Sequence, residues 1–241
     1  ICRYLHVPAQ SGSDRILKLM NRGYTVSEYL EFVDRVRHFL HQPEIARPVG
    51  ISSDFIIGFP TETDEDFEAT AALIRRARFK NSFIFKYSPR PGTVAFDKLA
   101  DDVPEPVKRT RNTALLSLQN DVSDLVAREY IGQKLRVFVE GPSKKHQAQA
   151  RQAGAGGAAS HGGTVSLTIS ARDAAPSTPS RPSTPGDSGE RIMQYCGRSD
   201  TDMIVFFDAP SPSAGGADLT HTFAEVQIDR VRSLSLFGTR V

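Results

Sequence analysis

Hydrophobic and polar positions in the first half of the chain follow two spacings, one typical of strands and one of helices. Short, nearly continuous apolar runs predict strands with both faces covered, as in parallel sheets. Between them, apolar residues recur at helical spacing, each time after a residue suited to cap a helix. This order predicts right-handed βαβ units of a parallel sheet or barrel. The expected strands are 3–8, 49–57 and 82–87, and the expected caps are Ser13, Thr25 and Thr63.

The pattern changes after one long helix, which is expected over 104–130 and ends before Gly132. Short alternating segments separated by Gly and Pro then predict a small antiparallel barrel. We therefore expect two domains, residues 1–130 and residues 131–241. The strands of the second domain are expected at 134–140, 203–207, 223–228 and 233–238.

A low-complexity segment interrupts the second domain. Ala, Gly, Ser, Thr and Pro make up 31 of the 44 residues in 146–189. Such a composition buries too little apolar surface to offset the chain entropy of folding, so we expect a disordered loop. Within it, Val165, Leu167 and Ile169 alternate and are also consistent with an added hairpin strand.

Composition narrows the class of protein. With 30 Lys and Arg against 28 Asp and Glu, the net charge of +2 excludes a strongly basic nucleic-acid coat. No apolar run is long enough to span a membrane. Cys2 and Cys196 are the only cysteines and have no histidine at metal-ligand spacing, so we expect no metal ligand and a reducing cytoplasm. The chain begins at Ile1, which suggests an internal boundary of a longer protein.

Several polar residues at strand ends are candidates for chemistry. His6 is either a catalytic base or a histidine bonded to backbone beside a loop. Asp54, on an apolar strand, either holds a ligand or makes a structural hydrogen bond. The turn 10–14 is either a ligand-binding loop of an α/β barrel or a helix start, and 58–62 allows close backbone approach to a ligand.

Taken together, four segments in order resemble the radical S-adenosylmethionine (SAM) methylthiotransferases, and most closely the group acting on isopentenyladenosine in tRNA. The small barrel, with Glu140–Lys144 and Gly197-Arg198, resembles a TRAM domain, an OB-like RNA-binding module. The resemblance covers nearly the whole chain except 146–189. The four segments are HVPAQSGSD (6–14), MNRGYT (20–25), DFIIGFPTET (54–63) and KYSPRPGT (86–93).

The resemblance implies a fold and an activity. The fold class is α/β, with the distal half of a TIM-like radical SAM barrel followed by an all-β TRAM barrel. The implied reaction is methylthiolation at C2 of N6-isopentenyladenosine next to the tRNA anticodon, with SAM and [4Fe–4S] clusters as cofactors. Clusters require several thiolates, so their ligands are expected outside this chain, which alone is expected to be inactive.

The resemblance also assigns residues. A glutamine and an arginine twelve positions apart, Gln10 and Arg22, are implied to contact the ribose and the carboxylate of SAM. For Arg22, a cation stabilising a helix C-terminus is the competing interpretation. The implied SAM-binding residues are Gln10, Ser11, Arg22, Asp54, Ile57 and Gly58, and the RNA-binding candidates are Arg90, Lys134, Arg136, Lys144, Lys145 and Arg198.

Alternatives remain at this stage. The scaffold is shared by enzymes acting on threonylcarbamoyladenosine in tRNA and by enzymes acting on a ribosomal protein, and a catalytically inactive RNA-binding fragment has the same residues. The expected partner is tRNA, with no membrane association, and the protein is expected to be monomeric. Thr61 departs from the family pattern, because relatives more often carry glycine there.

Overall fold

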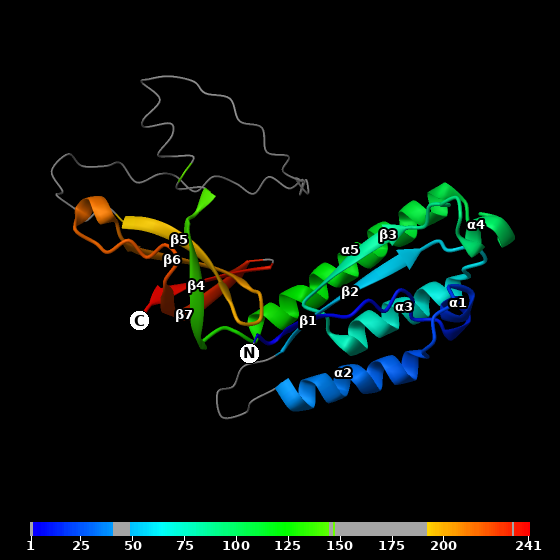
Figure 1. Cartoon of the computed structure of the whole chain (residues 1–241), viewed down its shortest axis with the longest axis horizontal. Coiled ribbons are helices and arrows are strands. Elements are labelled where there is room, and N and C mark those ends of the chain that lie inside the picture. The colour runs from blue at the N-terminus through cyan, green and yellow to red at the C-terminus, as the bar shows by residue number, and fades with distance from the viewer. Residues whose placement is uncertain (1, 41–48, 145–146, 148–191, 233) are drawn as a thin grey trace, which may run out of the picture.

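The computed structural model describes residues 2–40, 49–144, 147, 192–232 and 234–241. Two units lie next to each other along the long axis, a three-stranded sheet with helices and a closed five-stranded barrel (Figure 1). Lys145 and the expected loop at 146–189, apart from Gln147, lie outside the described residues, as does the alternating segment within that loop.

The first unit is a parallel βα arrangement. Its strands pair in parallel in the order β1-β2-β3, which confirms the expected βαβ units. The strands are β1 (Tyr4–His6), β2 (Gly50–Ile57) and β3 (Asn81–Lys86). The helices are α1 (Asp14–Leu19), α2 (Val26–Leu40), α3 (Asp64–Ala77), α4 (Val94–Lys98), which the sequence analysis did not predict, and α5 (Glu105–Arg128).

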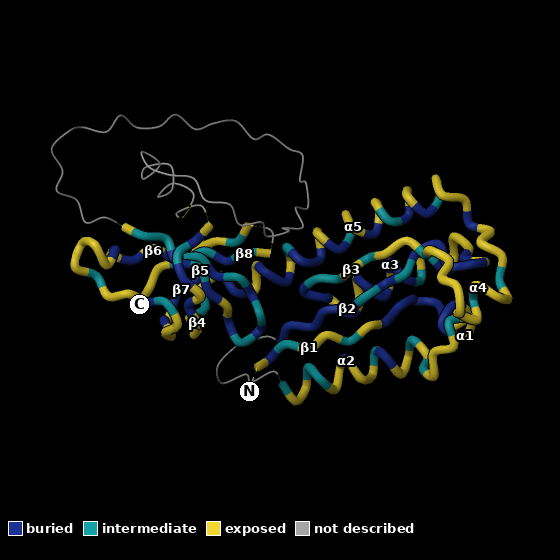
Figure 2. The backbone as a smooth tube through the Cα atoms, turned by 45° about the horizontal axis from the view of Figure 1, so that its top comes forward, coloured by how far each residue is buried: buried dark blue, intermediate teal, exposed yellow. Residues whose placement is uncertain are grey.

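The two faces of this sheet differ in character. Ile51, Phe55 and Ile57 of β2 are buried in a core that includes residues of α2, α3 and α5. The opposite face is open, and Phe83 and Phe85 on β3 keep 53% and 54% of their surface exposed. The burial colours of Figure 2 accordingly mark β3 as intermediate or exposed. A sheet covered by helices on one face only matches one half of a βα barrel, whose other face would line the barrel interior.

The second unit is a closed barrel with strand order β4-β5-β6-β8-β7. Pairing of β4 with both β5 and β7 closes the barrel. The strands are β4 (Lys134–Pro142), β5 (Ile192–Ser199), β6 (Ile204–Pro210), β7 (Phe223–Arg232) and β8 (Ser235–Arg240), with a short 3-10 helix, η2 (Pro212–Ala214), between β6 and β7.

The structure corrects the sequence analysis of this barrel in two ways. Strand β5 was missed, because two of its inward positions are the small residues Gly197 and Ser199 and its hydrophobic alternation is weak. Strands β6 and β8 are parallel rather than antiparallel. The connection from β6 to β7 crosses the barrel end, and the β7–β8 hairpin then returns beside β6 in the same direction.

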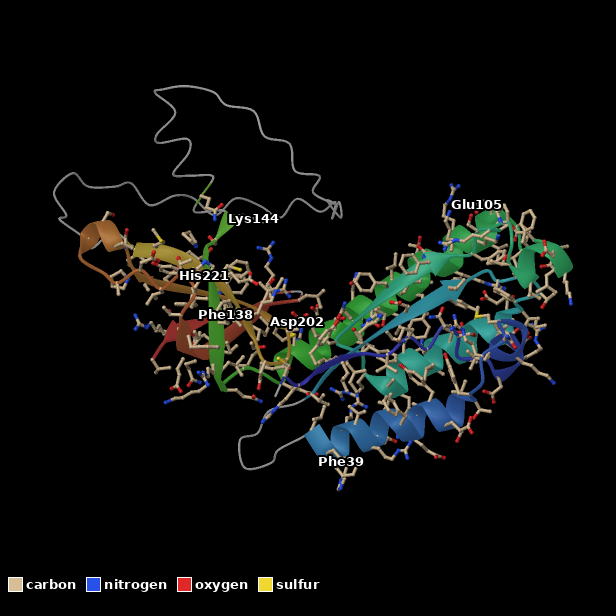
Figure 3. All side chains as sticks on the ribbon, in the orientation of Figure 1. Phe39, Glu105, Phe138, Lys144, Asp202 and His221 are labelled. Atoms are coloured by element: carbon tan, nitrogen blue, oxygen red, sulfur yellow. The ribbon has the colours of Figure 1, made fainter. Side chains whose placement is uncertain are left out.

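The turn between β5 and β6 contacts the first unit. The Tyr130 hydroxyl donates to Thr201 Oγ1 at 2.9 Å, and Lys80 Nζ lies 2.9 Å from Asp202 Oδ2. The backbone N–H of Arg3 donates to the carbonyl of Asp200 at 2.7 Å. Asp202 therefore lies where the barrel meets the amino ends of the parallel strands (Figure 3).

Candidate functional site

Gln10 holds a rare backbone conformation at the carboxyl end of β1. Its φ is +68°, and the N–H of Ser11 donates across it to the carbonyl of Ala9 at 2.9 Å, the hydrogen bond of a γ-turn. The flanking sheet fixes this turn, because the Gln10 N–H donates to the Asp54 carbonyl and the Gln10 carbonyl accepts from the Ile56 N–H. Strain of this kind persists where the surrounding structure enforces it, and it concentrates at functional sites.

Asp54 stands beside that turn on the open face of the sheet. Its Oδ2 lies 3.2 Å from His6 Nε2, and His6 Nδ1 lies 2.7 Å from Ser52 Oγ. Ser52 is in turn 2.7 Å from the Tyr4 hydroxyl. The other carboxylate oxygen of Asp54, Oδ1, is buried and has no hydrogen-bond partner among the described residues. The structure shows the hydrogen bond of the structural interpretation at Oδ2, while a ligand at Oδ1 stays a prediction.

Ser11 serves the local structure. It is 2% exposed, and its Oγ accepts from the N–H of Ser13 at 3.1 Å. Next to it, a Cβ on Gly12 would lie 2.4 Å from the carbonyl oxygen of Ala69, so α3 and this loop approach at a distance that only glycine allows. The Ser11 side chain is therefore an internal hydrogen-bond acceptor at this position.

Arg22 lies on the loop after α1. Asn21 has φ +56°, the Asn21 N–H donates to the carbonyl of Lys18, and the Arg22 N–H donates to the carbonyl of Leu17. These two bonds form a Schellman motif, which fixes the backbone of Arg22. The side chain is exposed, and no described residue forms an ion pair with it. The hydroxyl of Tyr24, two residues on, donates to the carbonyl of Ala9, so this loop lies over the Gln10 turn.

The loop after β2 is anchored by a buried ion pair that the sequence analysis missed. The N–H of Gly58 donates to both carboxylate oxygens of Glu62 at 3.0 Å, and Arg111 of α5 donates to Glu62 Oε1 at 2.8 Å. Burial raises the pKa of Glu62, while the Gly58 N–H and Arg111 act in the opposite direction. Arg111 lies on the buried side of α5 among apolar residues, and that placement was the available sequence signal.

Ile57 and Gly58 face the helices rather than the open face of the sheet. The side chain of Ile57 is fully buried in the helix-facing core. Gly58 has φ +70°, and a Cβ there would lie 2.3 Å from Cγ of Lys108. The Ile57 carbonyl accepts from the N–H of Tyr87, and the Gly58 N–H donates to Glu62, so these backbone groups are already bonded within the fold.

The helix next to this loop is held by Asp66. Ser13 Oγ donates to Asp66 Oδ1 at 2.5 Å, Thr63 and Asp66 form a capping box, and Arg15 also donates to the carboxylate. Burial acts to raise the pKa of Asp66, but the hydrogen bonds from Arg15, Ser13 and Thr63 hold it well below its usual range. These contacts fix the start of α1 against the start of α3.

The RNA-binding candidates lie in different places. Lys134 and Arg136 point outward from β4, where the Arg136 guanidinium lies 4.1 Å from the ring centre of Phe223. Arg198 is exposed and paired with Glu140 and Asp202. The remaining two described candidates, Lys144 at the end of β4 and Arg90 in the loop after β3, are exposed.

The described residues form neither a metal-ligand cluster nor a membrane-spanning helix. Across the described ranges, His, Cys, Asp and Glu side chains form no group of three or more suited to a metal ion. Cys2 is exposed, Cys196 is half-buried, and both are free thiols. Among the helices that the structure describes, none combines the length and apolar character needed to cross a bilayer.

Comparison with known proteins identifies the first unit. Residues 1–74 match the family model described as the radical SAM superfamily. The chain therefore carries part of a radical SAM domain, placed where the open-faced sheet and the Gln10 turn lie.

The relatives of the whole chain are more particular. A tRNA-2-methylthio-N(6)-dimethylallyladenosine synthase of Rhodopirellula baltica is 41% identical over 98% of this chain and 39% of its own length. A protein of the same name from Aeromonas hydrophila is 39% identical over 99% of the chain. Another, from Acidithiobacillus ferrooxidans, is 50% identical over 59% of the chain. The resemblance to methylthiotransferases is thus confirmed, and the chain spans about two fifths of the length of these first two relatives.

Proposed function

We propose that this chain is the distal part of a tRNA methylthiotransferase that modifies C2 of N6-isopentenyladenosine next to the anticodon. The observation that carries the proposal is the similarity to proteins named for this product, which runs through both units in order. In this proposal the open-faced sheet binds SAM, and the small barrel binds tRNA. Because the substrate is tRNA, we infer that the protein acts in the cytoplasm. We also propose that it is a monomer.

The residues at the strand ends fit SAM. The unpartnered, buried Oδ1 of Asp54 is placed to accept a hydrogen bond, as a ribose hydroxyl would donate. Gln10, fixed by its γ-turn beside Asp54, adds an amide to the same end of the sheet. Arg22, exposed on the loop after α1, supplies a guanidinium for a carboxylate. SAM, when bound, supplies the radical chemistry of this superfamily.

The residues of this chain do not fit a [4Fe–4S] cluster. The cluster needs at least three thiolates, and the sequence contains Cys2 and Cys196 alone, on different units. We therefore place the cluster ligands in another part of the longer protein, and we assign no step of the reaction to a cluster here.

The small barrel fits RNA through its outward cations. Lys134 and Arg136 on β4, Lys144 and Arg198 are available to phosphates on its surface, and Arg90 projects from the sheet unit. Contacts of this kind give an affinity that falls as salt rises and that depends little on sequence.

The test uses the longer protein that contains this chain, produced without oxygen and supplied to a host that lacks its own methylthiotransferase. Mass analysis of tRNA nucleosides should show the 2-methylthio derivative of isopentenyladenosine. A methylthio group on threonylcarbamoyladenosine, or on a ribosomal protein, would assign the chain to the other relatives. No modification at all, together with retained tRNA binding, would favour an inactive RNA-binding protein.

Two substitutions test the site itself. In the reconstituted longer protein, Asp54→Ala and Arg22→Ala should each weaken SAM binding, measured by equilibrium dialysis, by at least about tenfold. Their tRNA affinity should not change, because both residues lie on the sheet unit. Glu68→Gln, an exposed change on α3, is the matched control. Unchanged SAM affinity in either variant would remove that residue from the site.

A further inference from the structure

One face of the small barrel carries side chains in ordered rows across four strands. Cys196 of β5 is in register with Phe206 of β6, which is in register with Phe237 of β8, and Phe237 is opposite Arg230 of β7. Because facing residues on paired strands point to the same side of a sheet, these four form one row on the outside of the barrel. The row beside it consists of Arg198, Ile204, Ser235 and Arg232.

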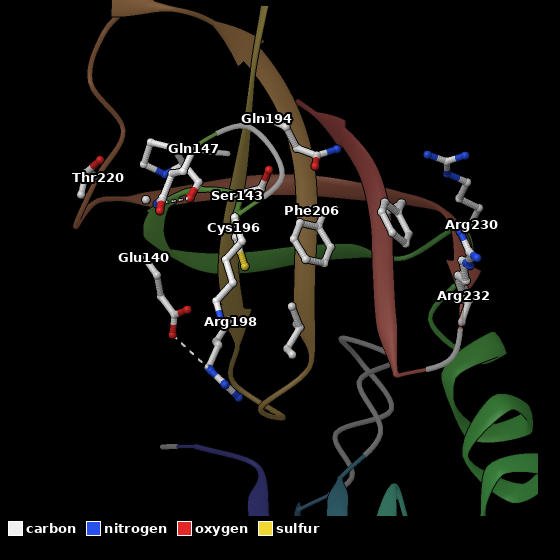
Figure 4. Close-up of a pocket in the computed structure, with 16 residues that line it drawn as sticks. Glu140, Ser143, Gln147, Gln194, Cys196, Arg198, Phe206, Thr220, Arg230 and Arg232 are labelled. Atoms are coloured by element: carbon white, nitrogen blue, oxygen red, sulfur yellow. Dashed lines mark hydrogen bonds and ion pairs between the residues drawn. The ribbon is translucent and has the colours of Figure 1, made fainter. Parts of the chain in front are cut away.

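Three members of the first row stack on one another. The rings of Phe206 and Phe237 are nearly parallel, with centroids 5.2 Å apart and planes inclined by 22°. The guanidinium of Arg230 lies 4.8 Å from the centre of the Phe237 ring. Phe237 is thus covered on both faces, whereas Phe206 is covered on one. The next position of the row beside Phe206 is Cys196, on the neighbouring strand (Figure 4).

Cys196 is the small side chain of the row, and space opens beside it. A cavity of about 1050 Å³ lies over this face, and Cys196 and Phe206 both line it. Its rim carries Glu140 of β4 and Lys144, two residues after β4, on one side and Arg230 on the other. The row therefore ends in a slot next to an aromatic ring, with cations at both ends.

The charges favour an anionic ligand. In the described part of the chain, neither Arg230 nor Arg232 has an ion-pair partner, and Lys144 is likewise unpaired. Among the described residues of the rim, Arg198 is the one basic side chain held by carboxylates, those of Glu140 and Asp202.

A second aromatic cluster, on β4 and β7, lies outside this cavity. Phe138 and Phe223 meet edge to face at 62°, and Arg136 already lies over the ring of Phe223. Arg136 also faces Glu225 across the two strands, so its charge has a neighbour of opposite sign. Because the Phe138 ring does not line the cavity, Phe138 is a suitable control position.

We propose that the slot over Cys196 holds one unpaired nucleobase of the RNA, stacked on the free face of Phe206. The phosphates on either side would meet Lys144 at one end and Arg230 and Arg232 at the other. Unpaired bases stack on aromatic side chains in this way, while neighbouring cations hold the backbone. The inference rests on the proposed tRNA-binding function, which it makes specific for a single-stranded element.

The test fills the slot or removes its wall. Cys196→Leu places a larger side chain in the slot, Cys196→Ser leaves it open, and Phe206→Leu removes the stacking ring. We expect Cys196→Leu and Phe206→Leu to weaken binding of a fluorescent anticodon stem-loop by at least about fivefold. Cys196→Ser and the control Phe138→Leu should bind as the unaltered chain does. Affinity for a fully paired RNA duplex of equal length should be the same for all five proteins.

Protection of Cys196 from alkylation by bound RNA, a chemical footprint, gives a second measurement that does not depend on a substitution in the slot. In a Cys2→Ser background, iodoacetamide should alkylate Cys196 slowly, because burial raises the pKa of this thiol. The stem-loop should slow the reaction further, and the duplex should not. If thermal unfolding shows that a slot variant is misfolded, the footprint decides the question.

The outcomes separate the two proposals. If the unaltered chain binds neither RNA, the proposed function of the barrel is wrong. If it binds the stem-loop while Cys196→Leu and Phe206→Leu bind equally well, or while alkylation is unprotected, the nucleobase slot is wrong and the cations alone account for RNA binding.

Discussion

Thr61 carries backbone strain that a glycine would avoid. Its φ is +68°, a conformation that costs a non-glycine residue about 1–2 kcal/mol and is least suited to a β-branched side chain. Glycine adopts this conformation freely. We predict that Thr61→Gly raises the free energy of unfolding by about 0.5–1 kcal/mol, after the greater flexibility of glycine in the unfolded chain is subtracted.

Urea unfolding of the chain measures this change. The substitution also removes the hydrogen bond that Arg15 donates to Thr61 Oγ1, but this bond is exposed and contributes little. Thr93→Gly is the control, because Thr93 has φ −103° at a helix N-cap and should be neutral or slightly destabilised by glycine. Equal destabilisation by both substitutions would show that Thr61 is not strained.

Motifs located the candidate residues, but they did not give their side-chain directions. Asp54 and Ile57 belong to the same predicted segment, yet Asp54 faces the open side and Ile57 the helices. Alternation along a strand settles this only once the register is known. The γ-turn at Gln10 was also beyond the sequence, because glutamine has no preference for positive φ.

At the scale of elements, the ionised side chain of Asp66 holds the starts of α1 and α3 together, so the stability of this contact depends on pH. Its folded pKa is lowered, so its stabilising contribution is present at neutral pH and is lost as the pH falls from about 4 through the folded value. We predict that Asp66→Asn lowers the free energy of unfolding at pH 7 by about 2–3 kcal/mol, since the substitution removes hydrogen bonds to a charged acceptor.

The pH series provides the check. Between pH 7 and pH 3 the unaltered chain should lose stability more steeply than Asp66→Asn, so that the two curves converge in acid. Glu68→Gln, on the exposed side of the same helix, should follow the unaltered chain. Parallel curves for Asp66→Asn and the unaltered chain would contradict the role assigned to Asp66.

Helix starts were the most predictable part of the fold. Ser13 and Thr63 cap α1 and α3 as expected, because a capping side chain and the apolar spacing after it act locally. Strand β5 and the parallel pairing of β6 with β8 were not predicted, because both depend on partners distant in sequence. The barrel could therefore be anticipated as a class, and its strand order could not.

At the scale of the whole molecule, Lys80 connects the two units. It is 6% exposed and donates to Asp202 and to the carbonyl of Thr201 across the interface. Burial lowers the pKa of Lys80, and Asp202 partly opposes this effect. We predict that Lys80→Met, which keeps the packing, weakens the attachment of the barrel by about 2 kcal/mol.

Calorimetry should show a broader or divided thermal transition for Lys80→Met. In limited proteolysis, this variant should be cleaved near Gly132 earlier than the unaltered chain. The matched control is Lys86→Met, which removes an exposed ion pair with Glu105 and should leave a transition like that of the unaltered chain. A single, unshifted transition for Lys80→Met would mean that the two units are held together by other contacts.

The last turn of α5 belongs to both units. Ala127 of α5 and Tyr130, in the turn just after the helix, are buried in the core of the small barrel, while Leu115 and Val122 of α5 lie in the core under the sheet. For this reason, the barrel cannot be exchanged between proteins as an independent domain that begins at residue 131. A chimera with a related protein should be joined inside α5, before Ala127, so that the end of the helix and the barrel it packs into come from the same parent.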